Sequence, residues 1–298
     1  MWKEGGCMQA CGKNTAVREP VDVAAALARP KIDMHAHVWP MQGEAVSSSH
    51  LIACGARLGI TEFWCSAPIT GGRLAPIEEV RAHNDVILRA MERHPGRIRG
   101  MAFLIPGQPG VIEEAERCLG RGMIGFKLYN QYKLHDPVVE PIIKLATERR
   151  VPVLVHAAYL PAPEHQRQQP LTSHGADFAV ASEKYPDALL IHAHIGGGGD
   201  WEWTLRALRD ASPNVYVDVS GSNLDAGQVE MAVAELGAKR VLFGTDGTMA
   251  GSVGKVLDAD LTEEEQDLIF WRNAARLLAE QGLAPLNMPR GDAQCSST

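Results

Sequence analysis

Hydrophobic and polar residues alternate in short β-rich segments that recur along the chain and end in polar residues or glycine. Eight such segments are present, at 31–38 (KIDMHAHV), 59–66 (GITEFWCS), 98–105 (IRGMAFLI), 123–129 (MIGFKLY), 151–159 (VPVLVHAAY), 188–195 (ALLIHAHI), 214–221 (NVYVDVSG) and 240–247 (RVLFGTDG). Their starts lie roughly 25 to 40 residues apart, the room that a strand, a helix and two loops need in a parallel βα unit. The pattern therefore predicts eight parallel strands.

The stretches between these segments have apolar residues at helical spacing. Clear examples are 76–95, 137–150, 200–211 and 225–238, and a last helix is marked by a capping box of Thr262 with Glu265 and by a stop at Gly282. Eight βα units close into a TIM barrel, so we expect an α/β fold, a single-domain (β/α)8 barrel. We place the barrel at 31–283, after an N-terminal extension at 1–30 and before a flexible tail at 284–298.

Composition narrows the class of protein. The chain has 298 residues and a formal net charge of -7, which argues against a general binder of nucleic acid or of anionic membranes. The six cysteines form no C-x-x-C pair and are interpreted as reduced thiols. The N-terminus lacks the pattern of a secretion signal, and no apolar run reaches the length of a membrane span. We expect a cytoplasmic protein.

Candidate chemistry begins with two histidines in the first segment. His35 and His37 lie two residues apart, so in an extended strand both imidazoles project from one face, which Asp33 shares. Met34 and Ala36 are expected on the opposite face. The loops after the predicted strands are longer than those before them, which indicates that the carboxyl ends of the strands form the functional rim of the barrel.

Reading every strand for alternation gives a short set of polar residues expected inside the barrel near that rim. The set is His35, His37, Lys127, His156, His194 and Asp246. Each has an ordinary explanation by itself: His156 as a buried core histidine, Asp246 as a turn residue before Gly247, and Lys127 as a rim cation. Together, imidazoles and a carboxylate suit Zn, Mn or Fe(II), with one coordination position left for water. His192 shares the alternation of His194 but is expected one layer deeper, in a structural role.

The motifs IDMHAH, GFKLY, VLVHA, HIGGGGDW, LFGTDG and RNAARLL together resemble the amidohydrolase superfamily between about residue 31 and residue 280. The resemblance is strongest to the amidohydrolase-2 branch, which includes aminocarboxymuconate semialdehyde decarboxylase, resorcylate decarboxylases and dicarboxylate lactonases. It implies one divalent metal, zinc first and manganese or iron as alternatives, with four ligands: His35, His37, His156 and Asp246. In this reading His194 stays unligated and acts on the metal-bound water, while Asp246 also accepts a proton.

Several assignments remain open at this stage. Other amidohydrolases hold two metals through a carbamylated lysine, so Lys127 could be such a bridge, with His156 and His194 binding the second ion. With one metal, Lys127 would polarise a carbonyl or pair with a substrate carboxylate. Arg73, and the pair His165 and Arg167, are candidates for binding a substrate carboxylate. The run 196–199 (GGGG) fits either a tight turn or close backbone approach to a substrate anion.

The favoured function is metal-dependent hydrolysis of a small molecule's amide, lactone or ester-like bond by a metal-activated water. The alternative is non-oxidative decarboxylation of an aromatic or muconate-type carboxylic acid, which requires a carboxylate-binding arginine. A catalytically silent scaffold barrel is disfavoured because no member of the candidate site is missing. The expected partner is a small-molecule substrate, with no nucleic acid and no membrane, and the resemblance adds the expectation of a homodimer.

Overall fold

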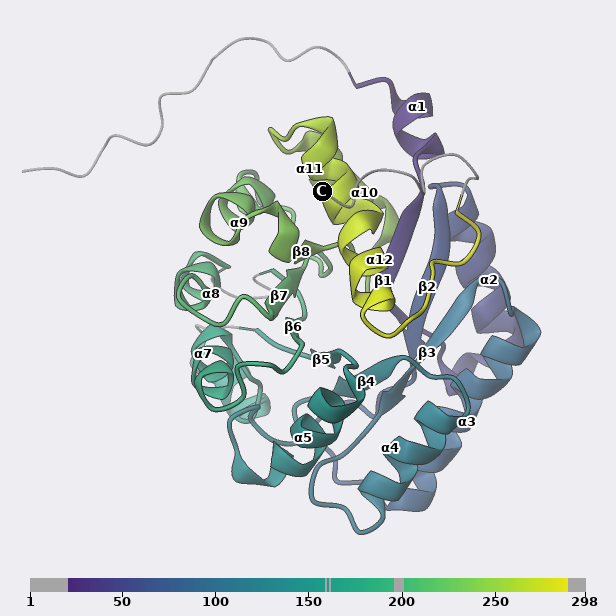
Figure 1. The fold of residues 1–298 in the computed structure, drawn as a ribbon, viewed down its shortest axis with the longest axis vertical. Helices are drawn as coiled ribbons and strands as arrows, with labels where there is room; N and C mark the ends of the chain where they lie inside the picture. The colour runs from purple at the N-terminus through teal and green to yellow at the C-terminus, as the bar shows by residue number, and fades with distance from the viewer. Residues whose placement is uncertain (1–20, 159, 161, 196–200, 289–298) are drawn as a thin grey trace, which may run out of the picture.

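Eight parallel strands form the centre of the protein, as the computed structural model of residues 21–158, 160, 162–195 and 201–288 shows (Figure 1). They are β1 (Lys31–His37), β2 (Ile60–Ser66), β3 (Ile98–Phe103), β4 (Gly125–Leu128), β5 (Val153–Val155), β6 (Leu190–His192), β7 (Val215–Asp218) and β8 (Val241–Leu242), and they neighbour one another in that order. Met34 N–H donates to the Phe243 carbonyl (3.0 Å) and Asp246 N–H to the His35 carbonyl (2.7 Å), which joins β1 to the segment after β8. The predicted TIM barrel is confirmed.

Helices surround the strands in alternation with them (Figure 1). They are α1 (Val23–Ala28), α2 (Glu44–Ala56), α3 (Ile77–Arg93), α4 (Val111–Gly120), α5 (Glu140–Arg149), α6 (Pro163–Gln168), α7 (Gly175–Lys184), α8 (Trp201–Leu208), α9 (Gln228–Leu236), α10 (Met249–Asp258), α11 (Glu263–Asp267) and α12 (Asn273–Ala279). The four helices predicted from spacing are present as α3, α5, α8 and α9. Helices α3, α5 and α9 are shorter at both ends than the sequence pattern, and α8 ends earlier than predicted. Short 3-10 turns, η1 (Pro40–Gln42), η2 (Pro137–Val139) and η3 (Ala238–Arg240), lie in the connections.

The last predicted helix begins as expected but is not continuous. Thr262 and Glu265 make both hydrogen bonds of the predicted capping box. After α11 the backbone widens into a π-helical segment, η4 (Leu268–Arg272), before α12 completes the run. The helix ends at Ala279, and Gly282 follows with a φ of 73°, a left-handed conformation that glycine adopts without strain.

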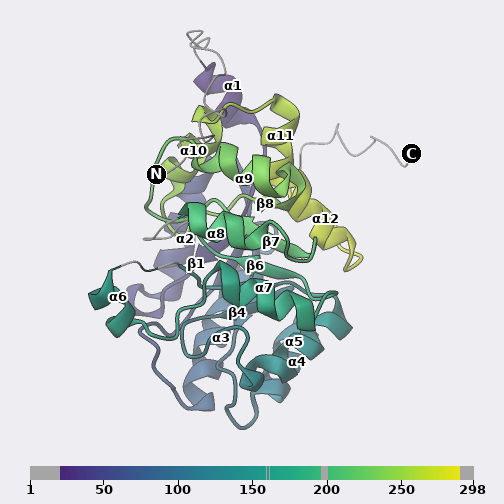
Figure 2. The same cartoon turned by 90° about the vertical axis from the view of Figure 1, so that its left-hand side faces the viewer.

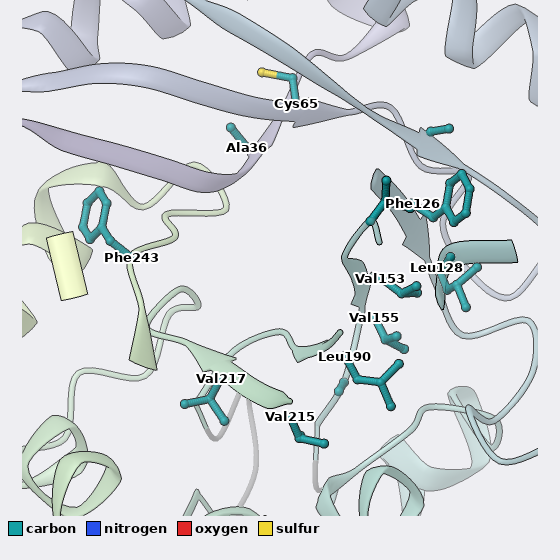
Figure 3. Packing of buried hydrophobic residues seen from close by; sticks show 14 of the residues in the cluster. Ala36, Cys65, Phe126, Leu128, Val153, Val155, Leu190, Val215, Val217 and Phe243 are labelled. Atoms are coloured by element: carbon teal, nitrogen blue, oxygen red, sulfur yellow. The ribbon is translucent and has the colours of Figure 1, made fainter. Parts of the chain in front are cut away.

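Apolar side chains pack on both the outer and the inner face of the strands. Outward-facing side chains of neighbouring strands, among them Val153, Leu190 and Val215, pack with buried residues of the helices (Figure 3). A second cluster combines inward-facing strand residues such as Met101, Leu154 and Ile191 with residues of α12. The part of the barrel interior next to α12 is therefore filled with apolar side chains, as the packing of a barrel interior requires. Trp64 also belongs to this inner cluster.

Strand β1 departs from the strict alternation that its sequence predicts. Met34 belongs to the inner cluster, whereas Ala36, two residues later, belongs to the outer one. The pairing register of β1 with β2 shifts between Asp33 and Ala36, so an irregularity in the strand reverses its faces at this point. The prediction that Met34 and Ala36 share a face is wrong for this reason. The irregularity still leaves His35 and His37 within reach of the same carboxylate.

Asp33 fastens β1 to the segment after β8. Its Oδ1 accepts hydrogen bonds from the backbone N–H groups of His35 (3.1 Å) and Thr245 (2.9 Å), and its Oδ2 accepts one from the Thr245 hydroxyl (2.6 Å). Burial raises the pKa of Asp33 to about 7. This network indicates that Asp33 holds the strand that carries the two histidines.

We expect Asp33→Ala to lower the free energy of unfolding by about 3 kcal/mol, because three buried donors lose their acceptor. Urea unfolding monitored by circular dichroism measures the change. Asp187→Ala, at an exposed position before β6, is the control and should stay within about 0.5 kcal/mol of the native protein. Equal stability of the two variants would contradict the role given to Asp33.

The described ends of the chain lie against the barrel. Arg29, just after α1, donates from Nε to Asp267 (3.1 Å) on α11, and Leu286 N–H donates to the Glu62 carboxylate (2.5 Å). The boundaries of the N-terminal extension and of the tail stay predictions, because residues 1–20 and 289–298 lie outside the described part of the chain. Among the described residues, no helix is both long enough and apolar enough to cross a membrane.

Candidate active site

The polar residues expected at the rim come from separate strands and lie at their carboxyl ends. His35 and His37 are in the last three residues of β1, Lys127 is in β4, and His156 directly follows β5. His194 and Asp246 follow β6 and β8 by two and four residues. The structure brings these six side chains into one cluster of contacts. The run 196–199 lies outside the described residues.

Asp246 is the centre of the cluster. Its Oδ1 lies 2.9 Å from His37 Nε2 and 3.8 Å from His35 Nε2, and its Oδ2 lies 3.9 Å from His194 Nε2. The Asp246 side chain is 32% exposed, whereas those three histidine side chains are at most 7% exposed. The carboxylate is thus the part of this group that a small molecule reaches from outside.

Two further contacts extend the cluster around the rim. His156 Nδ1 lies 3.2 Å from His194 Nε2, and the His156 ring stacks on Tyr129 with ring centres 4.1 Å apart. On the other side, Lys127 Nζ lies 2.9 Å from His35 Nε2. The Lys127 side chain is completely buried, so its amine is held at the cluster and not in solvent.

His194 reaches the cluster through an unusual backbone conformation. Ile191 and Ala193 belong to the inner apolar cluster, and His192 lies outside it, against Phe178 of α7 with ring centres 4.8 Å apart. Strict alternation would therefore point His194 outward as well. Its φ of 62° turns the chain so that the imidazole enters the barrel. The expectation that His192 and His194 share one face is wrong for this reason.

The backbone of Asp246 is also in the left-handed conformation, with a φ of 47°. Non-glycine residues in this region cost of order 1 to 3 kcal/mol and persist where the surrounding structure holds them. Two such residues in one cluster indicate that the geometry of this rim is maintained at the expense of stability, as is common at functional sites.

Burial controls protonation in the cluster. It lowers the pKa of His37 to about 4 and that of His194 to about 3, and it lowers the pKa of His156 well below its usual value. These three imidazoles are neutral near pH 7, so each keeps a nitrogen lone pair that can bind a metal or accept a hydrogen bond. Burial also lowers the pKa of Lys127 to about 8.

Asp246 shifts in the opposite direction. Burial acts to raise its pKa, but the hydrogen bond with His37 and the attraction of the His35, His37 and His194 rings hold the pKa well below its usual range. The carboxylate is therefore ionised under all ordinary conditions. A negative oxygen ligand stands among neutral nitrogen ligands.

This donor set fits a divalent transition metal. One ligand atom from each of His35, His194 and Asp246 lies within 4.8 Å of the others, and His37 Nε2 is aimed at the same carboxylate. Imidazole nitrogens and a carboxylate oxygen suit Zn, Mn and Fe. His194, expected from the sequence to stay unligated, belongs to this three-residue group. The assignment of individual ligands stays a prediction.

Two functional candidates in the rim, Asp218 and Ser220, were absent from the sequence-based set. Asp218 Oδ2 lies 2.9 Å from His35 Nδ1, and Ser220 Oγ lies 2.7 Å from His194 Nδ1. Burial acts to raise the pKa of Asp218, but the neighbouring His35 holds it well below its usual range. The alternation of β7 could have found Asp218, because Tyr216, two residues earlier, is in the inner cluster.

The arginine candidates for substrate binding have different surroundings. Both terminal nitrogens of Arg73 pair with the Glu79 carboxylate of α3, and among the described residues no contact joins Arg73 to the histidine cluster. Arg167, on α6, lines a cavity of about 610 Å³ together with Lys133, Ala158 and His174. Its guanidinium makes no hydrogen bond or ion pair within the described ranges. Ala158 lies two residues after His156, so the cavity adjoins the segment that carries this histidine. Figure 2 shows α6 projecting from the side of the barrel.

A family model described as amidohydrolase matches residues 32–279. The chain belongs to the amidohydrolase family. The predicted superfamily and branch are thereby confirmed, and the cluster at the strand ends is the candidate active site of an amidohydrolase-family enzyme. Among curated proteins, none matches the sequence.

Solved structures of amidohydrolase-2 relatives share the fold. A dihydroxybenzoic acid decarboxylase from Polaromonas sp. JS666, with bound manganese, aligns with a TM-score of 0.66 and 18% identity over 84% of this chain and 96% of the other. A 4-oxalomesaconate hydratase from Rhodopseudomonas palustris gives 0.67 and 15% over 85% and 96%. A 5-carboxyvanillate decarboxylase from Novosphingobium aromaticivorans, complexed with manganese, gives 0.65 and 17% over 84% and 96%. At such identities the likeness concerns the fold.

Proposed function

We propose that the protein is a divalent-metal-dependent hydrolase that cleaves an amide, lactone or ester-like bond of a small molecule. The observation that carries this proposal is the contact of one ionised, partly exposed carboxylate, Asp246, with three buried imidazoles. The same groups form a ligand set and a set of proton acceptors, which are the two requirements of hydrolysis at neutral pH.

The ligands proposed for one ion remain His35, His37, His156 and Asp246. An ion bound there would supply Lewis acidity for a carbonyl group and lower the pKa of water. Zinc is the first candidate, and the manganese in two of the similar structures supports manganese as an alternative. The alternative arrangement has a second ion, with carbamylated Lys127 as the bridge between the two. Burial lowers the pKa of this amine, which favours the neutral form that carbamylation requires.

His194 and Asp246 are the groups proposed to transfer protons, and Lys127 is proposed to act on the substrate. In hydrolysis a water oxygen bonds to the carbonyl carbon, and a water proton passes to neutral His194 or to Asp246. The bond to the leaving group then breaks as the leaving group takes up that proton. Lys127, fixed 2.9 Å from His35 Nε2, would polarise the carbonyl or pair with a substrate carboxylate.

Substrate anions are proposed to meet Arg73 or Arg167. We expect Arg167→Gln to raise KM for a carboxylated substrate by about tenfold with little change in kcat, because an exposed guanidinium lining a cavity contributes mainly to uniform binding. Arg73→Gln is compared under identical conditions. A larger rise in KM for Arg73→Gln would show that Arg73 binds the substrate carboxylate. The Arg73 side chain would then have to break its ion pair with Glu79 when substrate binds.

Decarboxylation is the second candidate function. Its support is that several of the similar structures are decarboxylases of aromatic acids, although the shared identity is 18% or lower for those described above. In that reaction the C–C bond to the carboxylate breaks, carbon dioxide leaves, and the carbon atom takes up a proton from a protonated group of the same cluster.

A paired assay distinguishes the two. Full-length protein is purified without chelators or a metal-binding tag, its metal content per chain is measured, and carboxylated lactones, amides and aromatic acids are screened for hydrolysis and for release of carbon dioxide. We expect about one Zn or Mn per chain and chelator-sensitive hydrolysis. Release of carbon dioxide without hydrolysis would replace the proposal by decarboxylation. Protein that binds no metal and is inactive in every screen would favour the scaffold class.

A further inference from the structure

Asp218 is a buried carboxylate that touches the candidate site from behind its histidines. It ends β7 and is completely buried. Its Oδ2 lies 2.9 Å from His35 Nδ1, on the ring edge opposite to the Nε2 atom that faces Lys127 and Asp246. Its Oδ1 accepts hydrogen bonds from the backbone N–H groups of Ser220 (2.9 Å) and His194 (3.1 Å) and lies within hydrogen-bond distance of the Ser220 hydroxyl.

The direction of the Ser220 hydroxyl proton follows from these contacts. Asp218 Oδ1 already accepts two N–H groups, so this oxygen carries no proton that it could offer to Ser220. A short contact between its oxygen and Ser220 Oγ is attractive only if the hydroxyl donates to the carboxylate. Ser220 Oγ then has only lone pairs for His194 Nδ1, 2.7 Å away, so the His194 proton must be on Nδ1.

The tautomer of His35 is fixed by contacts at both ring edges. Asp218 only accepts, so His35 Nδ1 carries the proton. On the opposite edge, a lysine ammonium only donates, so Nε2 of His35 offers its lone pair to Lys127. Two contacts on different strands therefore require one and the same tautomer.

We propose that Asp218 is a positioning residue that sets the tautomers of both His35 and His194, acting on His194 through Ser220. Both Nε2 lone pairs are thereby directed at the place where a metal ion and substrate would bind. This inference deepens the function proposed above and rests on it for the identity of the ligand. Hydrogen bonds from the outer nitrogen of metal-binding histidines commonly serve this purpose.

Gly221 completes the arrangement. A Cβ atom at this position would lie 3.3 Å from His194 Cβ and 3.5 Å from its Nδ1, and the φ of 95° is itself a conformation that favours glycine. The chain thus turns closely around the His194 ring immediately after the residue that bonds it. The ring has little room to flip and exchange its two nitrogens.

The test uses metal-free, full-length protein labelled with ¹⁵N at histidine, whose ring ¹⁵N shifts distinguish the two tautomers. Signals of His35 and His194 are assigned by their loss in His35→Gln and His194→Asn. We expect both rings to be protonated on Nδ1 in the native protein. Asp218→Asn should abolish the single tautomer of His35, because the new amide donates to Nδ1 while the Lys127 ammonium still donates to Nε2, and it should weaken binding of Zn²⁺ alone about 10- to 100-fold.

Ser220 variants separate the two branches of the network. Ser220→Ala should shift the tautomer of His194. It should leave that of His35 unchanged, because the Ser220 hydroxyl also lies 3.1 Å from His35 Nδ1 but Asp218 Oδ2 stays there as the acceptor. Ser220→Thr, which keeps the hydroxyl, should preserve both tautomers. These variants also decide the matter if Asp218→Asn does not fold. The control is Glu114→Gln, which replaces a buried carboxylate of α4 bonded to Asn84 and Arg117, and it should change neither tautomer nor Zn²⁺ affinity.

Native protein with His35 or His194 protonated on Nε2 would overturn the inference. So would unchanged tautomers and an unchanged Zn²⁺ affinity in Asp218→Asn and Ser220→Ala. Because the tautomers are measured without metal or substrate, they report on the network even if neither hydrolysis nor decarboxylation is found. In that case the proposed function fails while the role of Asp218 stands.

Discussion

Asp246→Asn is expected to lose most of the bound metal and to lower kcat/KM by about 10⁴-fold, a magnitude typical of losing a residue that the catalytic unit needs. The substitution converts an ionised carboxylate, centred among His35, His37 and His194, into a neutral amide. The amide is a weak ligand and cannot accept a proton from water. Metal analysis after gel filtration and steady-state kinetics measure the two effects on the same sample.

The comparison variant for Asp246→Asn is Asp187→Asn, which makes the same chemical change at an exposed position before β6. It should keep full metal content and full rate. Circular dichroism of Asp246→Asn should remain native, because asparagine tolerates the left-handed φ of this position. Full metal occupancy and a native rate in Asp246→Asn would remove Asp246 from the site.

For His194→Asn we expect retention of metal and loss of turnover by about 10³-fold, within the range measured for removal of a general acid or base. Burial lowers the pKa of His194 to about 3, so the imidazole is neutral near pH 7 and keeps a nitrogen lone pair for the proton of the attacking water. Asparagine tolerates the left-handed φ of this position but cannot take up a proton. Metal content and single-turnover kinetics are the measurements.

His192→Asn is the matched control for that variant. It removes another buried imidazole two residues away, which contacts Phe178 and lies outside the candidate site. Both variants lose packing, but only His194→Asn should lose turnover at equal folded fraction. Loss of metal in His194→Asn would show that His194 is a ligand. His35, His194 and Asp246, whose ligand atoms lie within 4.8 Å of one another, would then share a metal ion, and the two-metal arrangement would gain support.

The chain itself determined the barrel and most of the rim. Eight alternating segments at nearly regular spacing leave room for one helix each, and consecutive parallel strands joined in this way close into a barrel. Because the carboxyl ends of all such strands meet at one rim, polar residues at those ends, such as Lys127, His156 and Asp246, were predictable neighbours. The capping box of Thr262 is likewise encoded in four consecutive residues.

Only the tertiary structure decided which way particular side chains point. Alternation is a local rule, and it failed at β1, where the register shifts between Asp33 and Ala36, and at His194, where the backbone is left-handed. Each departure is held by a hydrogen bond with a residue distant in the sequence: Thr245, after β8, bonds Asp33, and Asp218 of β7 bonds His194. Local alternation does not take such contacts into account. Asp218 and Ser220 were not predicted for the same reason. They act through His35 and His194, and these contacts form only when separate strands come together.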